Sequence, residues 1–180
     1  MNLQLARVLS GLLLVAGWTA HGASLRDELQ SGRNAYFAGE FKKAIQELEP
    51  IAMADPKNAE AQFWLGKSYA MVADINAPLL NLHARAKAHS HLEAAARLRP
   101  ENAEYRDDLF NYLIDSEGSR AALREAEALA HTVPEESAEY AFMQSRLELE
   151  RKTDSRAEYV TSEIFLFGPR HVAGLASLGR

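Results

Sequence analysis

Three histidines are the residues of this chain whose type and proximity come nearest to metal chemistry. His83, His89 and His91 fall within one expected helix, at separations of six and two residues. Side chains share a helix face when they are three or four residues apart, so this spacing does not assemble a tetrahedral metal site. We therefore expect no metal site and no cofactor.

Residue patterns typical of catalysis are also missing from the sequence. The acid pairs Asp107-Asp108 and Glu135-Glu136 are expected on different helix faces or at a helix start, as solvated carboxylates. His131 is expected near a helix end, where a partly charged imidazole suits the helix dipole. The chain has no cysteine and no metalloprotease, nucleophile-elbow, phosphate-loop or dinucleotide-binding motif. We expect a protein that is not an enzyme.

Length, composition and charge set the class of protein. The chain has 180 residues, of which 47% are hydrophobic, which is enough for one domain with a real core. Its formal net charge of -5 argues against a general nucleic-acid binder, which would carry a basic surface. The absence of cysteine also excludes disulfides and a lipoprotein anchor.

Residues 1–22 have the three parts of a secretory signal peptide. Arg7 precedes an apolar run over residues 8–17, which is shorter than the roughly 20 residues of a membrane-spanning helix. The small residues Ala20 and Gly22 favour cleavage after Gly22, with cleavage after Ala23 as the alternative. We expect a mature domain over residues 23–180, located in the periplasm or, alternatively, secreted, with no later membrane span.

The remaining chain contains an internal repeat. Its register is marked by prolines spaced by 44, 34 and 35 residues, with an alanine twelve residues before each: Pro56, Pro100, Pro134 and Pro169, with Ala44, Ala88, Ala122 and Ala157. A cap residue, alanine and glutamate follow the first three prolines, beginning at Asn58, Asn102 and Ser137. Each triplet predicts a helix start, and a period of about 34 residues with two helices predicts a helical solenoid.

This pattern resembles the tetratricopeptide repeat (TPR) family. The stretch from Gly32 to Ile45 is similar to the first helix, turn and second-helix start of such a repeat, and Trp64-Leu65-Gly66 with Tyr69 follows the same order. The resemblance implies that Gly32 and Gly66 leave room for a close helix crossing.

The predicted fold is an all-α, TPR-type solenoid of about four helical hairpins. The repeats cover residues 25–56, 59–100, 103–134 and 138–169, and residues 170–180 form a short helix or tail. Phe110 and Ser145 replace the small glycine in the last two repeats, as expected toward a terminal cap.

The second repeat carries a ten-residue insertion at about residues 75–84. Its sequence is apolar for a loop, and Asn76 with Pro78 predicts a second helix from about Pro78 to Arg99. Leu79, Leu80 and Leu82 are candidates for a docking surface. The alternative is that the insertion folds back over its own core.

The TPR resemblance implies that the first helices of the repeats line a groove that binds a protein or peptide. The matching positions form a row of mostly basic residues and a row of mostly apolar ones: Arg33, Lys67, Asn111 and Arg146, and Leu29, Phe63, Asp107 and Phe142. The cations suit an acidic segment or a carboxylate. Nearby acids could instead neutralise them internally: Glu60, Glu104, Asp107, Glu139 and Glu150.

The sequence therefore predicts a non-catalytic protein-interaction module of the cell envelope, without nucleic-acid ligands. The alternative is a structural subunit of an envelope assembly that docks through the insertion.

Overall fold

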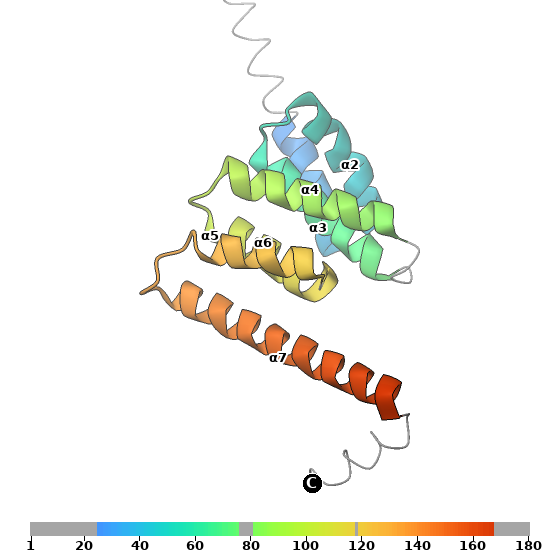
Figure 1. Cartoon of the computed structure of the whole chain (residues 1–180). Coiled ribbons are helices and arrows are strands. Elements are labelled where there is room, and N and C mark those ends of the chain that lie inside the picture. The colour runs from blue at the N-terminus through green and yellow to red at the C-terminus, as the bar shows by residue number, and fades with distance from the viewer. Residues whose placement is uncertain (1–24, 76–80, 118, 168–180) are drawn as a thin grey trace, which may run out of the picture. The chain divides into compact units, whose positions relative to one another are not determined.

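The computed structural model describes residues 25–75, 81–117 and 119–167, and the described part is entirely helical. Seven helices follow one another in the chain (Figure 1): residues 25–37, α2 (Phe41–Ala54), α3 (Ala59–Ile75), α4 (Leu82–Leu98), α5 (Ala103–Tyr112), α6 (Arg120–Ala130) and α7 (Ala138–Phe167). A short π-helix, η1 (Leu113–Glu117), continues from α5. The expected signal peptide and the tail of residues 170–180 lie outside the described residues.

Helix starts fall where the repeat predicts them. Asn58 accepts a hydrogen bond from the Ala61 backbone N–H at 3.1 Å, and Asn102 accepts one from Tyr105 at 3.4 Å. Ser137 accepts from Tyr140 at 3.0 Å in the same way at the start of α7. These side chains satisfy backbone donors that have no partner inside the helix.

The chain divides into two units, residues 1–112 and 113–180. In the first unit, α3 packs against α2 and α4, and Figure 1 shows α3 lying behind α4. Helix 25–37 contacts α3 on another side, through Tyr36 and Trp64. In the second unit, α6 packs against η1 and α7.

Close helix crossings organise the first unit. A Cβ atom on Gly32 would lie 2.5 Å from Cγ of Leu48 in α2, and one on Gly66 would lie 2.9 Å from the backbone nitrogen of Leu92 in α4. Ala44 and Ala88 are completely buried. The glycines therefore allow the close approach that the sequence predicts at these two positions.

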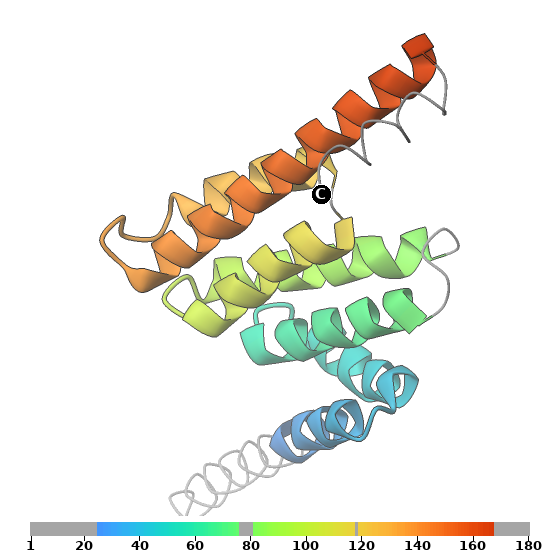
Figure 2. The ribbon, with the colours of Figure 1, turned by 90° about the horizontal axis from the view of Figure 1, so that it is seen from below.

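Two predicted helix boundaries are wrong. Helix α4 begins at Leu82 rather than near Pro78, because the non-helical Asn81 precedes it. The fourth hairpin is absent, since α7 runs unbroken from Ala138 to Phe167 through the expected turn (Figure 2). The first hairpin turns at Gly39, with φ of 77°, whereas α7 contains neither glycine nor proline to end the helix.

Candidate functional site

In the first unit, each basic residue of the predicted row forms an ion pair with an acid on the first helix of the following repeat. Arg33 Nη1 lies 2.8 Å from Glu60 Oε1 in α3, and Lys67 Nζ lies 2.5 Å from Asp108 Oδ2 in α5. All four side chains are between a quarter and two fifths exposed. The row in this unit is thus neutralised within the chain, and its pairs link helix 25–37 to α3 and α3 to α5.

An aromatic cluster surrounds the same cations. Lys67 Nζ lies 5.0, 5.5 and 5.9 Å from the ring centres of Phe63, Trp64 and Tyr36. The guanidinium of Arg33 lies 5.2 Å from the centre of the Trp64 ring. Each favourable cation–π contact contributes about 0.5–1 kcal/mol at an exposed site. Arg33 and Lys67 therefore hold Trp64 in place as well as pairing with acids.

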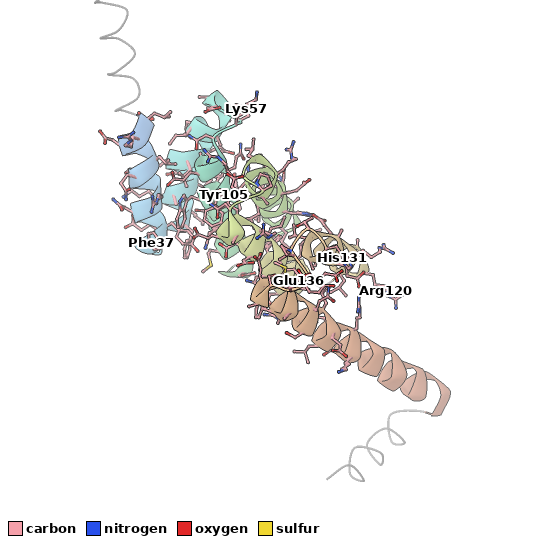
Figure 3. All side chains as sticks on the ribbon, turned by 90° about the vertical axis from the view of Figure 1, so that its left-hand side faces the viewer. Phe37, Lys57, Tyr105, Arg120, His131 and Glu136 are labelled. Carbon is pink, nitrogen blue, oxygen red and sulfur yellow. The ribbon has the colours of Figure 1, made fainter. Side chains whose placement is uncertain are left out.

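Phe37 is the exposed member of this cluster. It lies at the C-terminal end of helix 25–37 and is 69% exposed (Figure 3). Its ring contacts Trp64 edge-on at 5.2 Å and Tyr36 at 5.6 Å. We call Tyr36, Phe37 and Trp64 the aromatic platform. It presents a fixed apolar side chain to solvent.

The predicted apolar row is only partly at the surface. Phe63 is 1% exposed, and Tyr105 stacks on it at 4.4 Å between ring centres, so the structure places this predicted groove residue in the core. Leu29 is half-buried. Asn111 is half-buried too, and its Oδ1 atom is buried without a hydrogen-bond partner.

The remaining two predicted groove residues belong to the second unit. Arg146 Nη2 lies 2.5 Å from Asp115 Oδ1 in η1, and Phe142 is 49% exposed. Arg146 thus also pairs within the chain. Of the acids named from the sequence as neutralising partners, Glu60 is confirmed, while Asp108 and Asp115 were missed.

The predicted docking insertion is described only at its end. Leu82 is 73% exposed in the first turn of α4, whereas Leu79 and Leu80 lie outside the described residues.

A buried polar network connects α2, α3 and α4, and sequence reasoning missed it. Gln62, 6% exposed, donates to the Pro56 carbonyl at 3.3 Å, and its Oε1 atom lies 2.6 Å from Nδ1 of His91. The His91 ring stacks on Tyr69, whose hydroxyl donates to Glu49 at 3.1 Å. The sequence held no signal for this network, because Gln62 and His91 are 29 residues apart and form no recognisable motif.

Burial changes the ionisation of this network. It lowers the pKa of His91, with Lys87 adding to the effect and Glu49 opposing it. Burial, followed by the hydrogen bond to Glu49, raises the pKa of Tyr69 to about 12. His91 Nε2 is buried and has no hydrogen-bond partner, so the neutral imidazole suits this site.

A polar pocket of about 460 Å³ lies where α3 and α5 begin. Acids and bases of both signs line it, including Asp55, Lys57, Arg99 and Glu101. Arg99 lies 3.7 Å from Glu101 and Asp55 accepts from the Lys57 backbone, so these charges partly satisfy one another. Because its lining carries charges of both signs, the pocket favours neither an anion nor a cation.

The described residues contain neither a metal-binding cluster nor a membrane-spanning helix. Across residues 25–75, 81–117 and 119–167, no group of three or more histidines and acids is placed to hold a metal ion. No helix in the same ranges is long and apolar enough to cross a membrane.

No model of a known protein family matches the chain, and no curated protein matches it significantly. The fold and site define an all-helical protein in which sequential helices pack in pairs.

Proposed function

We propose that this chain is a non-catalytic protein-interaction module of the TPR type, which holds a partner segment on the aromatic platform. The TPR interpretation is supported by the repeat register and by the crossings at Gly32 and Gly66. The caps at Asn58 and Asn102 support it as well. The binding surface is formed by helix 25–37 and α3.

The exposed ring of Phe37 carries the proposal. A phenylalanine that is 69% exposed contributes little to the core, yet Tyr36 and Trp64 fix its ring from two sides. A ring fixed before binding loses little conformational freedom when a partner covers it. Covering such a side chain stabilises a complex by about 1.5–3 kcal/mol.

Apolar contact, rather than free positive charge, provides the affinity in this proposal. Glu60 and Asp108 already pair with Arg33 and Lys67, so an acidic ligand would have to displace them. Exchanging one carboxylate for another yields little net energy at sites that are partly exposed. The partner therefore offers an apolar or aromatic side chain to Phe37.

A pull-down with three matched variants tests this assignment. Phe37→Ser, Met53→Ser and Leu82→Ser each remove an exposed apolar side chain, and Met53 is 76% exposed on α2, away from the platform. We expect an envelope extract to yield a partner that wild type and Met53→Ser retain and Phe37→Ser loses. Equal retention by all variants would contradict the platform as the binding site.

The same experiment tests the second candidate, a subunit that docks through the insertion. The exposure of Leu82, at 73%, favours this candidate. Loss of the partner from Leu82→Ser alone would move the function to the start of α4. Circular dichroism of each variant checks that helix content is unchanged.

We further propose that the protein works in the periplasm or outside the cell. The signal-like residues 1–22 support this location, because their charge, apolar run and small residues follow the order of a secretory signal.

A further inference from the structure

The polar pocket at the starts of α3 and α5 has the size of a ligand site. Two loops, residues 55–58 before α3 and residues 99–102 before α5, supply most of its lining, and Ala59, Glu60 and Tyr105 complete it. Its volume of about 460 Å³ falls within the roughly 300–1,000 Å³ of small-molecule pockets. The chemistry of the two loops therefore decides what the pocket would hold.

The two loops carry opposite charges at equivalent positions of the repeat. Counting by the 44 residues that separate the first two repeat prolines, Asp55 corresponds to Arg99 and Lys57 corresponds to Glu101. Arg99 and Glu101 lie 3.7 Å apart on one loop, and no ion pair crosses the pocket among these four described side chains. Each loop thus presents one acid and one base that the other loop does not neutralise.

The hydroxyl of Tyr105 is an unused polar group in this pocket. The side chain is 9% exposed and its ring stacks on Phe63, yet its hydroxyl has no hydrogen-bond partner among the described residues. Burial raises the pKa of this hydroxyl, with Glu60 and Glu104 adding to the effect and Arg99 opposing it. Because Glu60 and Arg99 both line the pocket and both act on the hydroxyl, it points into the pocket as a neutral donor. A buried polar group without a partner is rare in proteins and favours a ligand that satisfies it.

Two amide groups add further donors to the lining. Asn58 and Asn102 use their side-chain oxygens to cap α3 and α5, so the nitrogens of both amides are left to donate elsewhere. Tyr105 lies deeper in the unit than Lys57, which is at its rim (Figure 3). The pocket therefore combines neutral donors with acids and bases on both loops.

A ligand with a single charge would meet a charge of its own sign on each loop, whereas a zwitterion can pair both of its charges. We propose that this pocket binds a small zwitterion with an ammonium and a carboxylate group, either a short peptide or a free amino acid. An extended tripeptide, at about 3.3 Å per residue, is about 10 Å long and has its two charges at opposite ends. This inference does not rest on the aromatic platform.

The two charged ends of the ligand meet opposite loops. The carboxylate pairs with the base of one loop, and the ammonium pairs with the acid of the other. The Tyr105 hydroxyl and the two cap amides donate to carboxylate or peptide carbonyl oxygens. Because Arg99 and Glu101 are 65% and 68% exposed, each ion pair adds little alone, and binding depends on both ends at once.

Calorimetric titration of the full chain, purified as the cell processes it, tests the class of ligand. The probes are alanine, trialanine, N-acetyl-trialanine and trialanine amide, and the last two each lack one of the two charges. We expect alanine or trialanine to bind, the tighter of the two identifying the source as amino acid or peptide, and both blocked peptides to bind at least tenfold more weakly than trialanine. No binding of either zwitterion at millimolar concentration, or equal binding of a blocked peptide, would overturn the proposal.

Three variants test the place of binding. Tyr105→Phe keeps the stacked ring but removes the hydroxyl, and Lys57→Glu leaves the first loop with acids alone, so both should bind the zwitterion several-fold more weakly. Lys42→Glu is the matched control, because Lys42 is exposed at the start of α2, and the 14 residues of that helix span about 21 Å. Circular dichroism checks that helix content is unchanged. Wild-type affinity in both Tyr105→Phe and Lys57→Glu, or an equal loss in Lys42→Glu, would contradict this pocket as the site.

Discussion

Gly66 lies against the backbone of α4, whereas Gly32 lies against a side chain. A Cβ atom on Gly66 would be 2.9 Å from the Leu92 nitrogen, which cannot move without shifting the helix. A Cβ atom on Gly32 would meet only the Leu48 side chain. In the third repeat, Phe110 stands in the glycine position and Ala126 in the leucine position, and both are fully buried.

We predict that Gly32→Ala and Gly66→Ala each lower the free energy of unfolding by about 1–3 kcal/mol, as overpacking does. Removing the opposing side chain should separate the two. Leu48→Ala should cost less stability in the Gly32→Ala background than in wild type, whereas the saving for Leu92→Ala in the Gly66→Ala background should be smaller. Urea unfolding of the two double-mutant cycles measures these coupling energies, and equal coupling would contradict the backbone contact.

His91 makes stability depend on pH. Burial lowers the pKa of His91 in the folded chain below the ordinary histidine value of about 6.5, so below that pH the unfolded chain binds a proton that the folded chain resists. The free energy of unfolding is therefore highest above pH 6.5 and falls as the pH drops. Between about pH 7.5 and pH 5.5, wild type should lose more stability than His91→Gln. Equal losses in urea unfolding would show that His91 does not couple to folding.

The helices α3 and α5 each begin with a single cap residue, Asn58 and Asn102. Asn58→Ala should lower the free energy of unfolding by about 1 kcal/mol, because it leaves the Ala61 N–H without its partner. Asn34→Ala is the control: Asn34 is exposed inside helix 25–37 and bonds only Gln30 of the same helix. Comparable losses from both, measured by thermal unfolding, would contradict the capping role.

Helix starts and close crossings could be predicted from the sequence, because both depend on local chemistry. The caps at Asn58, Asn102 and Ser137 follow from residue type and spacing. The continuity of α7 could not be predicted, because Ala157 and Pro169 keep the repeat register although Lys152 replaces the turn glycine. A repeat period predicts which positions face a neighbouring helix. It does not predict whether the chain turns between two such segments.

The candidate site could be predicted less completely. Arg33 and Lys67 were identified, but the choice of Asp108 over Asp107 depends on helix rotation. The burial of Phe63 depends on Tyr105, which is 42 residues further along the chain. Phe37 was not singled out, because its exposure results from the positions of Tyr36 and Trp64 around it.

Removal of residues 1–22 would change the whole molecule, since it sets where the mature chain begins. We predict that the chain isolated from the cells that encode it begins at Ala23, because a signal peptidase prefers small residues such as Ala20 and Gly22 before its cut. Intact mass and N-terminal sequencing measure this. A chain that retains residues 1–22 would contradict both the signal peptide and the proposed location.

The binding surface can be tested most directly through Trp64. The chain has two tryptophans, Trp18 and Trp64, and Trp18 lies within the segment expected to be removed. Residues 23–180 therefore contain one tryptophan, and it is part of the aromatic platform.

The decisive measurement is a fluorescence titration of residues 23–180 with the captured partner. We predict that binding changes Trp64 emission, that Phe37→Ser raises Kd about tenfold or more, and that Met53→Ser leaves Kd unchanged. If the partner binds without changing Trp64 emission, and equally well to Phe37→Ser, the aromatic platform is not the binding surface.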